Sequence, residues 1–211
     1  SLSFAPRIDF TDPNDPRHDV TLVIEGEKIY VSKQILAVHS PVFNAMFYGD
    51  FIEKDKKEIE LHDVDREEFI KMLNVIYQTN KMVEIDPIDS PDFLLKLGDQ
   101  FQIACVIERA QELLIKDVDL STAEKLKIAD ENNKLYELQE HCFSMLTTVR
   151  DFQIIEKSPV YSGLSEKMKA AFLKHKVMVK NKSVGGRKRG RAPVRAVKDS
   201  ESSTDSSSDS D

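Results

Sequence analysis

The sequence contains few of the residues that interrupt helices or cross-link small domains. Only 7 glycines and 8 prolines occur among its 211 residues, which favours many helices and few wide loops. Its two cysteines, Cys105 and Cys142, stand apart in apolar stretches with a helical pattern. We therefore interpret them as buried core thiols of a protein in a reducing compartment, in preference to a disulfide or a metal site.

Long apolar runs are also missing from the sequence. No stretch approaches the roughly 18 apolar residues that a transmembrane helix needs, so we expect no membrane partner. No basic segment followed by an apolar one is present either, which predicts that the chain has no secretory signal. Because the chain starts at Ser1 and not at Met, we expect an N-terminal piece to be missing.

The net charge of −7 is unevenly distributed along the chain. Residues 185–198 carry six Lys or Arg and no acid, whereas residues 199–211 carry five acids, seven serines and no base. Residues 1–184 hold 24 Lys and Arg against 32 Asp and Glu, so the expected folded part is acidic and offers no obvious surface for polyanions. The tail has too few apolar residues to offset its chain entropy by burial, which predicts disorder over 183–211.

Alternating apolar residues predict a short sheet near the N-terminus. The stretch 19–24 is β-rich, "EGEK" is expected to turn, and 29–32 is expected to pair back as a hairpin. Ser32 is predicted to cap a helix over 33–39 through its side chain. Ser40 and Pro41 are expected to start the next helix, Gly49 to end it, and residues 58–61 to form a third strand.

Helical spacing dominates the remaining sequence. Asp65 is predicted to cap a helix with Phe69, Leu73, Ile76 and Tyr77 on one face, because these residues are three and four positions apart. Further helical patterns follow from 90 to 116 and from 121 onward. A hairpin, two helices, a strand and a long helix do not form an alternating βαβ pattern. The sequence therefore predicts an α+β fold, with a three-stranded sheet flanked by a cluster of helices.

No catalytic motif accompanies these elements. The sequence contains no phosphate-binding loop and no GxGxxG, HExxH or GxSxG pattern. The five histidines are scattered, and the adjacent His141 and Cys142 would point about 100° apart on a helix, which makes a poor metal-binding pair. A Cys–His nucleophile pair assembled in the fold stays open beside the simpler interpretation of inert core thiols. We predict no enzyme activity, no cofactor and no bound metal.

Residues 19–116 resemble a BTB (POZ) domain. The resemblance rests on an Asp-Val strand, a hairpin, a small helix, a Ser-Pro-x-Phe helix, an x-I-x-L-x-D-V strand and a closing helix. The matching residues are Asp19-Val20, Leu36, Ser40-Pro41-Val42-Phe43, Met46-Phe47, Ile59, Leu61, Asp63-Val64, Phe69 and Ile76-Tyr77. The chain is most similar to BTB domains that follow a MATH domain in substrate adaptors, although we recognise no MATH domain in it.

The resemblance implies self-association with a second copy or with another BTB protein, with Asp19, Val20 and Lys33 as candidate contact residues. Two features depart from the family. Ser32 stands beside Lys33 where the family usually has His. Residues 1–18 are rich in turn-forming residues and show no helix pattern, whereas the family dimer often uses a helix ahead of the first strand.

The resemblance also implies a contact with a cullin-3 type scaffold. In such adaptors a hydrophobic residue, any residue and then Glu lie in the loop after the Ser-Pro-x-Phe helix, and Phe51-Ile52-Glu53 stands at that place. An exposed aromatic that enters a partner pocket can contribute about 2 kcal/mol or more to binding, and the carboxylate can fix the register. Alternatively, Phe51 folds back onto its own domain. Phe47 and Tyr48 are the neighbouring candidate contact residues.

Residues 118–182 resemble the helical extension, a 3-box or partial BACK domain, that widens the cullin contact in such adaptors. A plain helical cap on the BTB core is the other interpretation, and both can hold. We therefore expect an N-terminal segment over 1–18, a BTB domain over 19–117, the extension over 118–182 and a tail over 183–211.

Three interpretations remain for the basic cluster in the tail. It resembles a nuclear import signal, an AT-hook-like minor-groove contact or a solvated linker, and its residues are Arg187, Lys188, Arg189 and Arg191. The AT-hook interpretation is weakened because Ala192 separates Arg191 from Pro193. The acidic end has candidate phosphosites with an acid three residues on, at Ser202, Ser206 and Ser208. We hypothesise that this acidic end folds back on the basic run and masks it.

The leading prediction is a non-catalytic adaptor that links a cullin-3 ubiquitin ligase to an unidentified substrate protein, in the nucleus, the cytoplasm or both. The alternative is a chromatin-associated protein that self-associates through the BTB domain and contacts DNA through the tail. A small intracellular enzyme is the third possibility, and it would need an unusually reactive thiol at Cys105 or Cys142.

Overall fold

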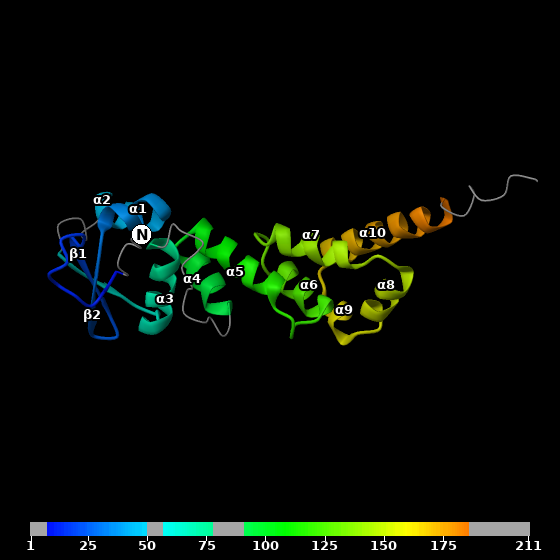
Figure 1. Cartoon of the computed structure of the whole chain (residues 1–211), viewed down its shortest axis with the longest axis horizontal. Helices are drawn as coiled ribbons and strands as arrows, with labels where there is room; N and C mark the ends of the chain where they lie inside the picture. The colour runs from blue at the N-terminus through cyan, green and yellow to red at the C-terminus, as the bar shows by residue number, and fades with distance from the viewer. Residues whose placement is uncertain (1–7, 50–56, 78–90, 186–211) are drawn as a thin grey trace, which may run out of the picture.

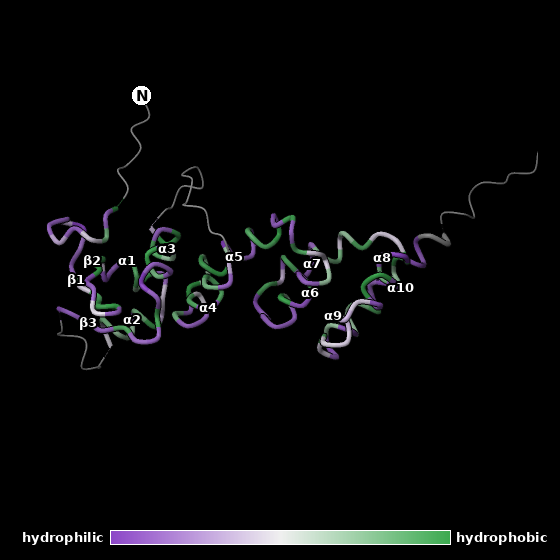
Figure 2. The backbone as a smooth tube through the Cα atoms, turned by 90° about the horizontal axis from the view of Figure 1, so that it is seen from below, coloured by the Kyte–Doolittle hydropathy of each residue, from purple (hydrophilic) through white to green (hydrophobic). Residues whose placement is uncertain are grey.

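The computed structural model describes residues 8–49, 57–77 and 91–185. Figure 1 shows an elongated arrangement, with the strands and the first four helices at one end and α6 to α10 at the other. Helix α5, Ala104–Lys116, lies between the two groups. Figure 2 shows the same order from a perpendicular direction, with α10 at the end remote from the sheet.

The sheet has the strand order β2-β1-β3. Strands β1, Val20–Ile24, and β2, Glu27–Val31, pair antiparallel, whereas β3, Glu58–Leu61, runs parallel to β1. The turn of the hairpin is Glu25-Gly26, with φ angles of 53° and 81°, so two residues suffice and β2 begins earlier than the predicted residue 29. Alternate residues of all three strands are buried against the helices, which explains their period of two.

The helices follow the predicted order closely. In the described ranges they are α1 Lys33–His39, α2 Pro41–Tyr48, α3 Arg66–Tyr77, α4 Asp92–Gln100, α5, α6 Thr122–Glu131, α7 Tyr136–Met145, α8 Val149–Glu156, α9 Pro159–Gly163 and α10 Glu166–Gly185. The Asp65 carboxylate accepts a hydrogen bond from the Glu68 N–H at 2.9 Å, as predicted for a cap of α3. Phe69, Leu73 and Ile76 are buried as predicted, and Met72 joins them.

One predicted cap is wrong. Ser32 occupies the N-cap position of α1, but its side chain makes no capping hydrogen bond. The Lys33 N–H donates instead to the Asp19 carboxylate, 2.6 Å away, so the cap of α1 comes from the start of β1. The Ser32 N–H donates to the hydroxyl of Tyr77, 2.8 Å away. This region is therefore fixed by partners 14 and 45 residues away in the chain.

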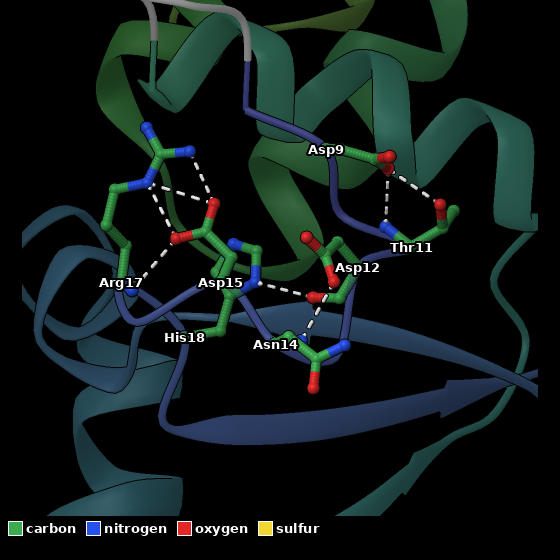
Figure 3. A network of polar contacts seen from close by, with 7 residues as sticks. All are labelled: Asp9, Thr11, Asp12, Asn14, Asp15, Arg17 and His18. Atoms are coloured by element: carbon green, nitrogen blue, oxygen red, sulfur yellow. Dashed lines mark hydrogen bonds and ion pairs between the residues drawn. The ribbon is translucent and has the colours of Figure 1, made fainter.

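The described part of the N-terminal segment consists of successive turns and no helix (Figure 3). The carboxylates of Asp9, Asp12 and Asp15 each accept a hydrogen bond from the backbone N–H two residues on, at 2.8 to 2.9 Å. Phe10 anchors the segment because its ring is buried 5.0 Å from the Tyr77 ring and its carbonyl accepts from the Tyr30 N–H at 2.8 Å. The segment from residue 8 thus packs on the sheet domain.

Two hydrophobic cores meet along α5. The first contains the inner face of the sheet and the buried residues of α1 to α4, and it extends into α5 as far as Ala110. The second begins at Leu114 of the same helix and contains the buried residues of α6, α7, α8 and α10. Because α5 contributes to both cores, the sheet domain and the helical extension share one rigid element.

Buried polar groups fix this junction. The side-chain oxygen of Gln111 accepts from the N–H groups of Glu137 and Leu138 at 3.0 and 3.2 Å, and its amide donates to the Glu137 carboxylate at 3.1 Å. The ammonium of the buried Lys125 donates to the Ile115 and Asp117 carbonyls at 3.1 and 2.5 Å. These hydrogen bonds give partners to N–H groups at the start of α7 and to carbonyl groups at the end of α5, which have no partner within their own helix.

Candidate interaction surface

Ser40 fixes the position of α2, the helix that precedes the predicted motif. Its side chain is 1% exposed, and its hydroxyl accepts from the Phe43 N–H at 3.1 Å. The same hydroxyl donates to the Phe101 carbonyl at 2.5 Å, and Pro41 follows at the first helical position. The predicted cap is confirmed, and in addition it ties the start of α2 to the turn between α4 and α5.

Four aromatic rings hold the inner face of α2. The Phe43 ring stacks on Phe101 with centroids 4.7 Å apart and on Phe47 at 5.6 Å. Phe69 of α3 meets both Phe43 and Phe101 edge-on, at 6.3 and 5.8 Å. Aromatic pairs in these geometries each contribute about 0.5–1.5 kcal/mol beyond their buried area. Helix α2 is therefore rigidly placed, and its other face is free to form a binding surface.

A groove lies between the outer face of α2 and strand β3. Its volume is about 490 Å³, and most of its surface is apolar; the lining residues are Pro41, Val42, Ala45 and Met46 from α2, Ile59 and Glu60 from β3, and Gln102. Glu60 is the one carboxylate among these lining residues. The groove can accept apolar side chains of a partner and can pair one cation or hydrogen-bond donor at its edge.

The predicted motif belongs to the segment that connects the two walls of this groove. Phe51, Ile52 and Glu53 lie outside the described residues, between the end of α2 and the start of β3 in the chain. Of the neighbouring predictions, Tyr48 is 52% exposed, whereas Phe47 is 1% exposed and packs in the core. Tyr48 is therefore available for contact with a partner protein, whereas Phe47 is a core residue beneath α2.

The residues proposed for self-association connect elements within one chain. The Asp19 carboxylate caps α1 at the Lys33 N–H, and Val20 is buried opposite Val31 in the sheet. The Lys33 ammonium lies 5.9 Å from the centroid of the Phe47 ring. On the same helix, Val38 is 76% exposed, so α1 presents an apolar residue to solvent.

The two cysteine thiols differ in burial. Cys142 is buried in the second core, and burial raises the pKa of its thiol to about 11. Cys105 is half-buried with its Sγ 3.8 Å from His39 Nδ1, and burial, followed by the charge of Glu108, raises its pKa as well. A nucleophilic cysteine needs a lowered pKa, so the raised pKa of Cys105 disfavours a thiolate in this Cys–His pair.

The described ranges offer neither a metal site nor a membrane-spanning helix. Among those residues no group of three or more His, Cys, Asp or Glu is arranged to hold a metal ion. None of the described helices is long and apolar enough to cross a membrane. The tail residues predicted for import, DNA contact or phosphorylation lie outside the described residues; they are Arg187, Lys188, Arg189, Arg191, Ser202, Ser206 and Ser208.

Sequence reasoning missed the groove, although it identified the helix that forms it. The stretch "PVFNAMFY" is apolar on more than one side, and such a helix has to bury one face and offer the other to a neighbour. That signal was available in the sequence. The second wall, formed by Ile59 and Glu60, had no local signal, because its place beside α2 depends on the parallel pairing of β3 with β1.

Comparison with known proteins finds a family model and several curated relatives that match this chain. The family model described as the BTB/POZ domain matches residues 11–118. BTB and MATH domain-containing protein 38 of Caenorhabditis elegans is 36% identical over 176 residues, which are 83% of this chain and 44% of the relative. BTB and MATH domain-containing protein 36 of the same species is 39% identical over 155 residues, 74% of this chain and 47% of the relative.

A relative from a second species agrees with these matches. BTB and MATH domain-containing protein 39 of Caenorhabditis briggsae is 28% identical over 157 residues, 72% of this chain and 45% of the relative. This chain thus spans about half the length of these curated relatives. The family model starts at residue 11, directly after Phe10, whose ring is buried in the first core.

Proposed function

Because the chain belongs to the BTB/POZ family, whose domain is a protein-interaction module, we propose that it is a non-catalytic adaptor of a cullin-3 ubiquitin ligase. It binds the cullin-3 type scaffold along α2 and brings a substrate protein to the ligase for ubiquitination. The chemistry of ubiquitin transfer belongs to the ligase and not to this chain.

The groove between α2 and β3 is the observation that supports this proposal best. Its apolar lining by Val42, Ala45 and Met46 suits a partner helix that inserts apolar side chains, as in other helix-in-groove complexes. In the chain, the segment that carries Phe51 and Glu53 connects α2 to β3, the two elements that form the walls of the groove. One contact surface can therefore combine a groove that receives side chains with an aromatic residue that enters the partner.

The helical extension supports the same proposal because it is held rigidly beside the BTB domain. Gln111 and Lys125 hold α5, α6 and α7 together through buried hydrogen bonds, so the extension stands in a defined position beside the BTB domain. An ion pair between Lys134 Nζ and Asp99 Oδ1, 2.5 Å apart, adds a link between α4 and the segment before α7. A scaffold that contacts α2 can then contact the extension without a rearrangement of the adaptor.

Self-association is the second part of the proposal. The BTB domain supports pairing with itself or with another BTB protein, and α1 exposes Val38 and Gln34 on the surface beside α2. We expect Val38→Glu to shift the sedimentation coefficient of the chain towards that of a monomer. An unchanged sedimentation profile in a chain that is dimeric before substitution would remove α1 from the interface.

The decisive experiment measures binding of the whole chain to the amino-terminal region of cullin-3 by calorimetry. Ala45→Gln extends a side chain into the groove at little cost to helix stability, so we expect at least a tenfold increase in Kd, about 1.4 kcal/mol. Phe51→Ala with Glu53→Lys should abolish measurable binding. Ala170→Gln on the exposed side of α10 is the matched control and should leave Kd unchanged.

Two results would refute this proposal. The first is absence of binding by the unaltered chain. The second is equal affinity of the unaltered chain and of the Ala45→Gln variant, because the partner would then not occupy the groove. Circular dichroism of each variant separates a lost contact from a lost fold.

A further inference from the structure

The charges of this chain are separated between its two ends. Residues 1–148 carry 16 Lys and Arg against 29 Asp and Glu, a net charge of −13. Residues 149–185, which form α8, α9 and α10, carry 8 Lys and Arg against 3 acids, a net charge of +5. Helix α10 alone has six lysines and one acid. The far end of the extension, α8 to α10, is therefore basic, whereas residues 1–148 are acidic.

The packed side of α10 is occupied and partly neutralised. Met168 and Phe172 are buried in the second core, and the Phe172 ring meets Phe152 of α8 with centroids 5.0 Å apart. Lys176 Nζ lies 2.6 Å from the Glu156 carboxylate, and Lys169 Nζ lies 3.1 Å from that of Glu166. These two lysines serve the contacts of α10 within the extension.

Of the four remaining lysines of α10, three are exposed and have no such role. Lys167, Lys174 and Lys182 make no ion pair or hydrogen bond within the described part of the chain. Lys167 and Lys174 are seven residues apart and so lie on nearly one line along the helix, whereas Lys182, eight residues later, is turned by about 80° from Lys174 around the helix axis. Met178, 53% exposed, stands between the last two. We call these three lysines the lysine ridge.

We propose that the acidic, serine-rich segment 199–211 of the same chain docks on the lysine ridge. A helix rises about 1.5 Å per residue, so the ridge lysines are spaced by about 10 and 12 Å along α10. In segment 199–211, Glu201, Asp205 and Asp209 follow one another every four residues, or about 13 Å in an extended chain. The spacing of the carboxylates thus matches that of the ammonium groups.

The covalent connection permits this docking. Helix α10 ends at Gly185, and 15 residues separate Gly185 from Glu201, which is enough to reach back to Lys182. The segment then runs antiparallel to α10, with Asp205 near Lys174 and Asp209 near Lys167. A tether of this kind raises the effective concentration of the segment, which compensates for the weakness of single exposed ion pairs.

The charge of the segment sets the strength of the docking, so phosphorylation can change it. The acidic surface of residues 1–148 repels the segment, so α10 is the described basic surface that fits it. Phosphorylation at Ser202, Ser206 and Ser208 would add about 1.5 to 2 negative charges each and would tighten the docking. A covered ridge is not available to another acidic partner, so the segment would control access to this end of the extension.

Zero-length carbodiimide cross-linking of the full chain, followed by mass spectrometry, tests the contact directly. We expect links from Glu201, Asp205 or Asp209 to the lysine ridge, and we expect them to disappear in about 1 M salt, where the screening length is about 3 Å. A mixture of isotopically light and heavy chains should give links within one chain. Links confined to Lys188 and Lys198, links between chains, or no links would overturn the proposal.

A second measurement does not depend on the cross-linked amines. Amide NMR signals of segment 199–211 should move when Lys167, Lys174 and Lys182 are changed together to Gln. The matched control changes three exposed lysines of the acidic part to Gln, at Lys57, Lys96 and Lys116, and should leave these signals in place. Equal effects of the two triple variants would show that net charge alone acts, and would refute docking on the ridge.

Discussion

Replacement of Ser40 by Ala tests how α2 is held in place. The Ser40 hydroxyl caps α2 at the Phe43 N–H and also donates to the Phe101 carbonyl, and the side chain is 1% exposed. Alanine keeps the helix propensity and removes both hydrogen bonds. Water cannot replace them at a site with so little exposure, so both backbone groups lose their side-chain partner.

The expected loss of stability follows from these two bonds. Removal of a Ser cap typically costs about 1 kcal/mol, and a buried carbonyl without a partner costs about 1–3 kcal/mol. We therefore expect Ser40→Ala to lower the free energy of unfolding of the BTB domain by about 2–4 kcal/mol. Affinity for the scaffold should fall as well, because the groove depends on the position of α2.

Urea unfolding followed by circular dichroism measures this loss, with Thr148→Ala as the control. Thr148 caps α8 through the Asp151 N–H at 3.3 Å but lies on the surface of the second core. Its replacement should cost about 1 kcal/mol and affect only the extension. If the two variants lose the same stability, the bond from Ser40 to Phe101 contributes nothing, and the reasoning on α2 is refuted.

Three further predictions concern buried polar and ionisable groups. Gln111→Ala should weaken the junction by about 1–3 kcal/mol, seen as faster hydrogen exchange in α7, because two N–H groups lose their acceptor. Cys142 should react with a thiol reagent far more slowly in the folded chain than in urea, since burial raises its pKa to about 11. Burial raises the pKa of Tyr77 from 10.0 to about 12, so the contribution of Tyr77 to stability should stay constant below pH 10 and should be lost as the pH rises from 10 to about 12.

Each of these predictions has a control. Gln153 is an exposed glutamine of α8, and Gln153→Ala should leave hydrogen exchange in α7 unchanged. Cys105, half-buried, should react faster than Cys142, and equal rates in the folded chain would contradict the assigned burial. Ultraviolet titration of the chain beside Tyr77→Phe isolates the Tyr77 signal, and a midpoint near 10 would show that the ring is solvated.

The local elements of this protein were largely predictable from sequence. Ser40, Pro41 and Gly49 fixed the ends of α2 because capping chemistry acts within one turn of helix. The spacing of Phe69, Leu73 and Ile76 predicted the buried face of α3 for the same reason. The position of Phe51-Ile52-Glu53 in the chain was also a sequence property, although it lies outside the described residues.

The tertiary structure decided which distant groups meet. Nothing near Phe10 indicates that its ring packs on Tyr77, and nothing near Ser40 selects the Phe101 carbonyl as its acceptor. The same holds for the parallel pairing of β3 with β1, which places one wall of the groove beside α2. Such contacts join residues far apart in the chain, and their choice depends on the packing of the whole core. Local patterns of residues were therefore enough to predict the elements and the family resemblance, whereas the groove, the junction and the exposed lysine ridge depend on how those elements pack.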